Sequence, residues 1–295
     1  MADTTPASSD IKPLVATRPS IEIRADVSGL THPGRVRANN EDHFLVTKAT
    51  RRLETIQTSL PAGDVPERDD EINYVMVVAD GMGGHAAGEV ASRLTISALV
   101  GLALQIPDWI FWVDEKHVPE IERRTREAVE QVGSMLIERG REEAALRGMG
   151  STLTAARSCG RDLLIVHVGD SRAYLFRAGR LERLTRDHTY AQLLLDAGEL
   201  SPGEANLSRF RHVLTNALGG SSKEVQVDMD LLRLEDGDRL LLCSDGLTDG
   251  VDDDTIAAAL GNAQPSADVA QRLLQCALDA GGRDNITVIV ATFRL

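Results

Sequence analysis

One local pattern recurs along the chain: an apolar run ends in an aspartate, and a small or turn-forming residue follows it. The pattern occurs at Asp80 in VVADGMGG, at Asp170 in VHVGDS and at Asp245 in LLCSDG. Each instance alone is ordinary turn chemistry, because aspartate and glycine tolerate unusual backbone angles. Together they put carboxylates at the ends of several strands, and neighbouring strands of one sheet lie only about 4.8 Å apart.

Further acidic residues extend the pattern. Asp284 precedes the apolar run at 286–293, and Glu41 with Asp42 follows Arg37 in the segment RANNED. Two carboxylates 4 Å apart repel each other by about 1 kcal/mol in water and by about 4 kcal/mol at an effective dielectric of 20. The acids are therefore either dispersed in the fold or neutralised by protons or bound cations.

The donor types indicate which cation such a cluster would bind. The sequence contains no HExxH, no CxxC and no clustered His/Cys set, which disfavours zinc. Carboxylates and waters suit Mg²⁺ or Mn²⁺, and Gly81 leaves room for its carbonyl to approach an ion. Glu89 stands where a nucleotide-binding P-loop needs lysine, and no GxSxG is present, so neither alternative is supported.

The elements that must position these residues are short apolar runs and longer amphipathic segments. Tyr174–Phe176 and Leu181–Leu184 flank Ala178-Gly179 and predict a hairpin, and Ser266 is predicted to cap the last helix. Many strands with a few long helices indicate a mixed fold of antiparallel sheets covered by helices. The predicted strands are 75–79, 163–168, 239–243 and 286–293, and the predicted helices are 86–105, 119–146 and 266–280.

Length and composition describe an ordinary globular chain. It has 295 residues, of which 42% are hydrophobic and 26% charged, and this size allows one or two domains. Residues 1–20 are rich in Ser, Thr, Pro and Asp and predict a flexible tail. Residues 49–72 are polar and contain proline, and they predict a surface insertion in the form of a loop. No linker divides the remainder, so we expect a single domain over 21–295.

Charge and hydropathy exclude several classes of partner. The net charge is −13, so nucleic acids and anionic membrane surfaces would repel the chain. The start of the chain has no signal-peptide pattern. The most apolar stretch, 96–113, is interrupted by Gln105, Pro107 and Asp108, which argues against a membrane span. We expect a cytoplasmic protein that binds neither nucleic acid nor membrane.

Seven motifs, taken in order, resemble those of the metal-dependent protein phosphatases, the type 2C serine/threonine phosphatases, in their bacterial branch. The similarity extends from about residue 22 to 295, and it implies an α+β fold: a four-layer αββα sandwich of two antiparallel sheets flanked by helices. The motifs are RANNED (37–42), ADGMGGHAAGEVAS (79–92), MGSTLTAA (149–156), HVGDSRAYL (167–175), LTRDHT (184–189), LLCSDGLTDGV (241–251) and GGRDNITVIV (281–290).

Carried over by position, the resemblance implies a centre for two Mn²⁺ or Mg²⁺ ions. Asp80 would bridge the two ions. The carbonyl of Gly81 would bind one of them, and Glu41 would anchor the same ion through a ligand or ordered waters. Asp245 and Asp284 would hold the other.

The resemblance also assigns roles around this centre. Asp170, together with Asp245, matches the third ion site of bacterial members. Arg37 would clamp the substrate phosphate, and Asp42 would orient a metal-bound water. A guanidinium suits this role because it holds phosphate oxygens in a planar, bidentate manner.

Two regions bear on access and proton transfer. Residues 190–212 match the mobile flap beside the site of family members. Met82 stands where eukaryotic relatives have a histidine proposed as general acid, and methionine cannot donate that proton. His85 is interpreted as a structural residue at a helix start, so the general acid stays unassigned.

The implied activity is hydrolysis of phosphoserine and phosphothreonine in proteins by direct attack of a metal-bridging water, without a phosphoenzyme. The expected partners are phosphorylated proteins, including a serine/threonine kinase, and we expect a monomer. Two alternatives remain: a pseudophosphatase that binds a kinase or phosphoprotein, and a two-metal hydrolase of another phosphate ester such as a nucleotide. Aromatic residues make up only 3% of the chain, which argues against stacking on bases.

Overall fold

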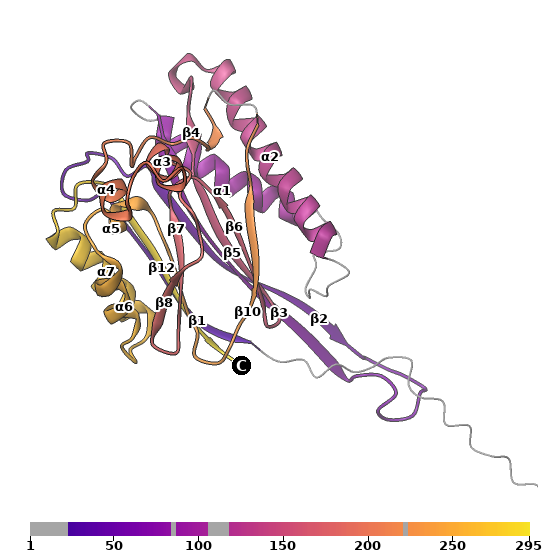
Figure 1. The fold of residues 1–295 in the computed structure, drawn as a ribbon. Helices are drawn as coiled ribbons and strands as arrows, with labels where there is room; N and C mark the ends of the chain where they lie inside the picture. Colours follow the sequence, from indigo (N-terminus) through magenta and orange to yellow (C-terminus); the bar gives the residue numbers. More distant parts are fainter. Residues whose placement is uncertain (1–22, 84–86, 106–117, 221–223) are drawn as a thin grey trace, which may run out of the picture.

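The computed structural model describes residues 23–83, 87–105, 118–220 and 224–295. Two antiparallel sheets lie face to face, and helices cover the outer face of each (Figure 1). The four-layer αββα sandwich is therefore confirmed. The predicted tail over 1–20 and His85 lie outside the described residues.

The first sheet has five strands, and β12 (Ile286–Arg294), the last described strand of the chain, lies between β1 (Arg24–His32) and β11 (Arg239–Cys243). Arg24 pairs with Arg294, so the first described strand lies beside the last. Ala178 and Gly179, both with positive φ, form the two-residue turn of the predicted hairpin. In spatial order the strands are β1, β12, β11, β7 (Arg172–Arg177) and β8 (Arg180–Arg183).

The second sheet has seven strands, and β3 is its longest. β3 pairs with both β2 and β5, and its last residues pair with the short β4. Besides β2, the spatial order is β10, β6, β5, β3, β4 and β9. The bounds are β2 (Asp42–Glu54), β3 (Arg68–Met82), β4 (Gly150–Ser151), β5 (Leu153–Cys159), β6 (Asp162–Val168), β9 (Leu218–Gly219) and β10 (Asp228–Arg233).

Successive side chains of the inner strands point into different hydrophobic cores, one between the sheets and one under the covering helices. This explains why the sequences of these strands are continuous apolar runs. In β12, Ile289 and Phe293 face the second sheet, whereas Val288 and Val290 pack against the helices outside the first sheet. Both faces of the strand are thus buried, and only Arg294 at its end is exposed. Burial on both faces favours apolar residues at every position, because a polar side chain there would lose its hydration.

Helices α1 (Ala87–Gln105) and α2 (Val118–Glu142) cover the second sheet, and a short 3₁₀ helix, η1 (Ala144–Leu146), follows α2. α2 is amphipathic and buries one stripe of apolar residues against the sheet. α1 is long and apolar enough to cross a membrane by length and composition alone, but its buried face belongs to the core beneath α1 and α2.

Helices α5 (Asp245–Thr248), α6 (Asp253–Leu260) and α7 (Ser266–Asp279) cover the first sheet. The prediction that Ser266 caps α7 is wrong by one residue, because Pro265 holds the cap position and Ser266 is the first helical residue. The backbone amide of Ser266 donates to Asp26 of β1 at 2.7 Å. A carboxylate from the neighbouring sheet therefore satisfies this helix end.

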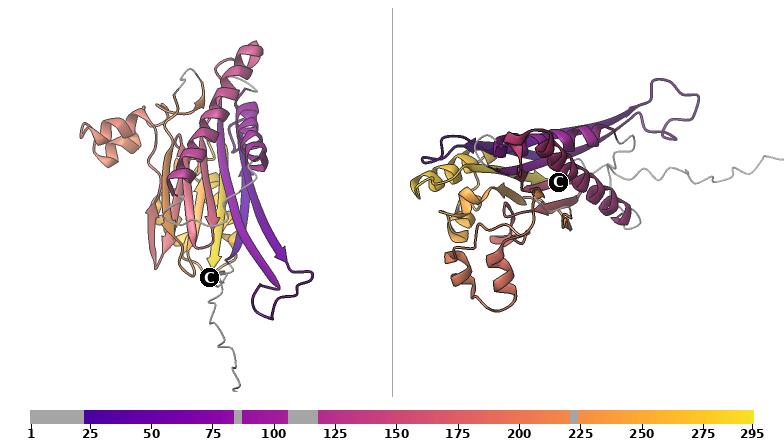
Figure 2. Two further views of the ribbon diagram at one scale, coloured as in Figure 1. Left: turned by 90° about the vertical axis from the view of Figure 1, so that its right-hand side faces the viewer. Right: turned by 90° about the horizontal axis from the view of Figure 1, so that it is seen from above.

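The segment 49–72 differs from the predicted loop. Its two ends continue the strands β2 and β3, which pair from Asp42 opposite Asp80 out to Glu54 opposite Arg68. Only the tip is irregular. The result is a two-stranded arm that projects beyond the sandwich (Figures 1 and 2).

The predicted flap, 190–212, is largely helical. It contains α3 (Tyr190–Asp196) and α4 (Pro202–Leu207), and it ends in a short stretch that leads to β9. Thr189 caps α3 and Ser201 caps α4 through a capping box. The two helices stand out from the sandwich on the side away from α1 (Figure 2).

Candidate metal centre

The predicted acidic residues converge where the two sheets meet at one end of the sandwich. Asp80 lies directly opposite Asp42 across the β2–β3 ladder. Burial raises the pKa of Asp80 well above its usual value, and the charges of four other carboxylates raise it further. In order of effect these four are Asp42, Asp245, Asp170 and Asp284. Such a set of buried acids requires protons or cations to neutralise it.

Each of these side chains is placed by the end of a strand. Asp245 opens α5 two residues after the end of β11, and Asp284 lies two residues before β12, so both follow or precede strands of the first sheet. Asp170 lies in the crossover from β6 in the second sheet to β7 in the first. The recurring strand-then-aspartate pattern thus delivers carboxylates from both sheets to one place.

Asp42 connects the two sheets at this place. Its Oδ2 accepts hydrogen bonds from Ser244, at 2.6 Å, and from Thr287, at 2.8 Å, both of the first sheet. Burial raises the pKa of Asp42 to about 7, although these two hydrogen bonds act in the opposite direction. Its other oxygen, Oδ1, is buried and has no hydrogen-bond partner among the residues that the structure describes. An orphaned buried oxygen is typical of a site that is completed by a water or an ion.

Two glycines allow the end of β3 to approach the start of α1. A Cβ on Gly81 would lie 1.9 Å from the carbonyl oxygen of Gly88. A Cβ on Gly88 would lie 2.6 Å from Oε2 of Glu41 and 2.8 Å from the carbonyl oxygen of Gly81. The Glu41 carboxylate and the Gly81 carbonyl therefore border the same small space. Burial raises the pKa of Glu41, and these oxygen donors fit a hard divalent cation.

Arg37 lies at the outer rim of the centre, with its side chain 56% exposed. Its Nη2 donates to Oδ2 of Asp284 at 2.7 Å. This hydrogen bond raises the pKa of Arg37, and the charges of Glu41 and Asp245 add to the effect. The predicted phosphate clamp and the predicted metal ligand are thus paired.

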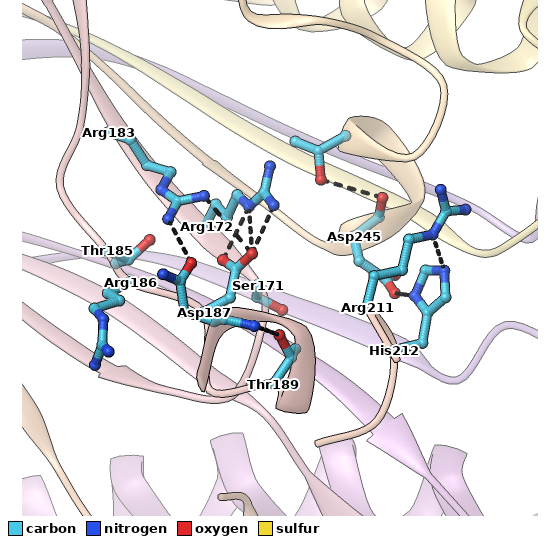
Figure 3. Close-up of polar contacts among 12 residues, drawn as sticks. Ser171, Arg172, Arg183, Thr185, Arg186, Asp187, Thr189, Arg211, His212 and Asp245 are labelled. Carbon is cyan, nitrogen blue, oxygen red and sulfur yellow. Dashed lines mark hydrogen bonds and ion pairs between the residues drawn. The ribbon is translucent and has the colours of Figure 1, made fainter. Parts of the chain in front are cut away.

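The flap contributes a residue that the sequence did not single out. Nδ1 of His212 lies 3.2 Å from Oδ2 of Asp245 (Figure 3). One ligand atom each from Asp170, His212 and Asp245 lies within 4.8 Å of the others. A hydrogen bond to Asp245 raises the pKa of His212. The only sequence signal was a lone histidine after Arg211 at the end of the flap.

A buried ion pair supports the Asp170 side of the centre. Nη2 of Arg172 donates to Oδ2 of Asp187 at 2.6 Å, and Nε donates to Oδ1 at 2.9 Å (Figure 3). Burial alone would raise the pKa of Asp187, but the Arg172 hydrogen bonds outweigh it and lower that pKa. Because the charges of Arg172 and Asp187 compensate each other, this ion pair forms a fixed wall beside Asp170.

A cleft of about 750 Å³ opens between the flap and helices α5 and α6. Asp170, Asp245 and His212 line it, as do Gln192 of α3 and Asp252, the residue that caps α6. It is large enough for a peptide side chain and its flanking residues, and it leads to the carboxylates.

Met82, the residue at the position of the eukaryotic histidine, faces the backbone of β4, because a Cβ on Gly150 would lie 2.6 Å from its Cε.

The fold and the site define an αββα sandwich with an acidic, oxygen-donor centre at one end of its two sheets, and the comparisons identify the family that has this fold. The protein phosphatase 2C model matches residues 55–289. PstP from Mycobacterium tuberculosis, a serine/threonine protein phosphatase, is 40% identical over 258 residues, covering 88% of this chain and 43% of PstP. The chain therefore spans less than half the length of that relative.

Two further comparisons cover nearly the whole of the matched chain, one with a second relative and one with the crystallised catalytic domain of PstP. Protein phosphatase PhpP from Streptococcus pneumoniae is 33% identical over 90% of this chain and 97% of PhpP. The crystal structure of the catalytic domain of PstP in complex with two manganese ions is 37% identical, with a TM-score of 0.72 over 93% of this chain and 100% of that chain. This chain belongs to the protein phosphatase 2C family. Nothing in the comparisons favours the pseudophosphatase alternative.

Proposed function

We propose that the chain is a metal-dependent protein serine/threonine phosphatase that hydrolyses phosphoserine and phosphothreonine directly. The observation that carries this proposal is the convergence of Asp42, Asp80, Asp170, Asp245 and Asp284 at one end of the sandwich, with Asp42 and Asp170 buried and the other three partly buried. The donor set consists of carboxylates and one glycine carbonyl, which suits Mn²⁺ or Mg²⁺. The names of the relatives and the two manganese ions in the PstP catalytic domain support it.

We assign the ligands as follows. Asp80 would be shared by two ions, Glu41 and the Gly81 carbonyl would hold one, and Asp245 and Asp284 the other. Asp170 with Asp245 would hold a third. When bound, the ions neutralise the phosphate charge and lower the pKa of water towards 7.

The chain's own residues then position the substrate and the attacking water. The buried, unpartnered Oδ1 of Asp42 is placed to accept a hydrogen bond from the attacking water and to orient it. Its Oδ2 is fixed by Ser244 and Thr287, so the carboxylate cannot turn away. A cation at Asp284 competes with Arg37 for Oδ2, which leaves the guanidinium available to a phosphate in bidentate geometry.

The test compares hydrolysis of p-nitrophenyl phosphate and of a phosphothreonine peptide with Mn²⁺ and with EDTA. We expect EDTA to abolish both activities. Asp80→Asn and Asp245→Asn should lower kcat at least about 100-fold, as is typical when a group that stabilises the transition-state charge is removed. Asp268→Asn, on the exposed first turn of α7, is the matched control and should retain activity.

Two outcomes of that test would contradict the proposal. One is full activity of Asp80→Asn. The other is normal Mn²⁺ binding without turnover of any phosphopeptide, which would favour the pseudophosphatase. Faster turnover of nucleotides than of phosphopeptides would reassign the substrate class.

We also propose phosphorylated proteins as the natural substrates, including a serine/threonine kinase, and a monomer in the cytoplasm. The net charge of −13 supports protein substrates over nucleic acids. Dephosphorylation of an autophosphorylated serine/threonine kinase, together with light scattering against the chain mass of 31.9 kDa, tests the partner and the monomer.

A further inference from the structure

The tightest group of metal-binding side chains combines three elements of different kinds. Asp170 follows β6, Asp245 is the first residue of α5, and His212 is the last residue of the flap. One ligand atom from each lies within 4.8 Å of the other two. A single ion among them would therefore contact both the sandwich and the flap.

Asp170 is the member of this group that most needs a cation. It is only 8% exposed, and no described side chain donates a hydrogen bond to its carboxylate. Burial raises its pKa well above the usual value, and the charges of Asp245 and Asp187 raise it further. A buried carboxylate without a side-chain donor, directed at an imidazole and a second carboxylate, indicates a ligand between them.

The hydrogen bonds of His212 show how its ring can become a ligand. Nε2 accepts from Nε of Arg211 at 2.7 Å, so in the neutral ring Nδ1 carries the proton and donates it to Asp245. Nε2 also lies 3.4 Å from Oδ2 of Asp249. When the proton moves to Nε2, Arg211 must give up its hydrogen bond to that nitrogen. Asp249 then accepts from Nε2, and Nδ1 presents a lone pair to the space shared with Asp170. A carboxylate that holds the far nitrogen is typical of metal-bound histidines.

We propose that His212, through Nδ1, is a ligand of the divalent ion held by Asp170 and Asp245, and that this ion ties the flap to the sandwich. Asp249 acts as the positioning residue for the imidazole. The inference rests on the proposed function only in its assignment of Asp170 and Asp245 as ligands.

If a nitrogen atom is one of the ligands, the site should prefer Mn²⁺ to Mg²⁺. Imidazole binds Mn²⁺ better than Mg²⁺, which prefers oxygen donors. If His212 only formed a hydrogen bond with Asp245, its loss would change the binding of both ions alike. The difference between the two metals therefore separates a ligand from a structural neighbour.

The experiment measures Mn²⁺ binding to the full chain by electron paramagnetic resonance of free Mn²⁺, and Mg²⁺ binding by competition. Asp170→Ala identifies the class of ions concerned. We expect His212→Ala to weaken Mn²⁺ binding in that class by about tenfold or more, with Mg²⁺ changed less than about threefold. Glu199→Gln, an exposed flap residue between α3 and α4, is the control and should bind both ions as the wild type does.

A second readout follows the flap itself. Trypsin cleaves after Arg209 and Arg211, and Mn²⁺ should protect these bonds in the wild type but not in His212→Ala. His212 is 43% exposed, so its replacement by alanine should leave the fold intact, as thermal unfolding would show.

Unchanged Mn²⁺ affinity in His212→Ala, or equal losses for Mn²⁺ and Mg²⁺, would overturn the proposal. Binding is measured without turnover, so the result is independent of the phosphatase assay. A chain that binds Mn²⁺ through His212 and hydrolyses no phosphopeptide would contradict the proposed function and leave this inference standing.

Discussion

Asp42 joins the two sheets through Ser244 and Thr287 while its remaining oxygen stays buried and unpartnered. This arrangement lowers the stability of the folded protein, because a charged carboxylate is destabilised when it is removed from water. The same feature gives the site an acceptor that is fixed before substrate arrives. Function and stability therefore oppose each other at this residue.

Asp42→Asn should stabilise the metal-free protein at pH 8 and inactivate it. The folded pKa is raised to about 7 from an ordinary value near 3.8, so the wild type loses stability as pH rises from about 4 to 7, and asparagine does not. We expect a gain of about 1–3 kcal/mol at pH 8 in EDTA, reduced by the weaker hydrogen bonds to a neutral amide. Urea unfolding at pH 4 and pH 8 measures it; an equal effect at both values would contradict the assignment.

His167 should lower the stability of the protein as the pH falls, whereas Asp42 lowers it as the pH rises. Its side chain is buried between Thr154 and the carbonyl of Arg186, and burial lowers its pKa to about 4 from 6.5. Between these values the unfolded chain binds the proton and the folded chain does not, so stability falls as pH drops from 6.5 to 4.

The corresponding measurement is the free energy of unfolding at pH 7 and pH 5 for the wild type and His167→Gln. The histidine should account for a loss of about 2 kcal/mol at pH 5, which is absent in the glutamine variant. Parallel pH profiles for the two proteins would show that His167 does not titrate in this range.

Single residues were predictable from the sequence where they lie at or just after the end of an apolar strand, because the end of a strand determines where the next side chains lie. Asp170 and Asp245 follow their strands, and Asp80 lies two residues before the end of β3. His212 could not be found in this way, since its place depends on how the flap folds back over α5. The true partner of the α7 amino end, Asp26, lies on β1 and carries no local signal.

Helix α1 contains two glycines in different surroundings, so one can serve as the control for the other. Gly88 lies against the Gly81 carbonyl and Glu41, whereas an added Cβ at Gly101 would meet nothing within 4 Å. Gly88→Ala should destabilise the protein by about 1–3 kcal/mol through overpacking and weaken Mn²⁺ binding. Gly101→Ala should stabilise it by about 0.4–1 kcal/mol by restricting the unfolded chain. Denaturant unfolding compares them; a similar effect at the two sites would refute the close approach.

Six strands of the sandwich, β3, β6, β7, β8, β11 and β12, were predictable from their apolar runs, but the arm was not. Residues 49–54 and 68–72 are polar on both faces, because the ribbon extends beyond the region where β5 pairs with β3. Without a core on either side, there is no hydrophobic alternation to indicate a strand. Only the pairing of β2 with β3, which is a long-range property, extends these segments.

The arm allows a prediction for the whole molecule. Replacing residues 51–71 by Asn-Gly, a favoured two-residue turn, should leave the sandwich intact. The ion pairs lost, such as Arg52 with Asp70, are largely exposed and contribute at most about 1 kcal/mol each. We expect turnover of p-nitrophenyl phosphate within about twofold of the wild type, since the arm points away from the carboxylates. Loss of that turnover in a folded variant would show that the arm supports the site.

The position of β12 has a consequence for biosynthesis. Its partners are β1 at one edge and β11 at the other, and Asp284 stands just before it. β1 and β11 are synthesised before β12, so both lack this partner until residues 286–294 have left the ribosome. A nascent polypeptide that ends before Asp284 therefore lacks one strand of the first sheet and one carboxylate of the centre, and we expect β1 to remain unpaired in it.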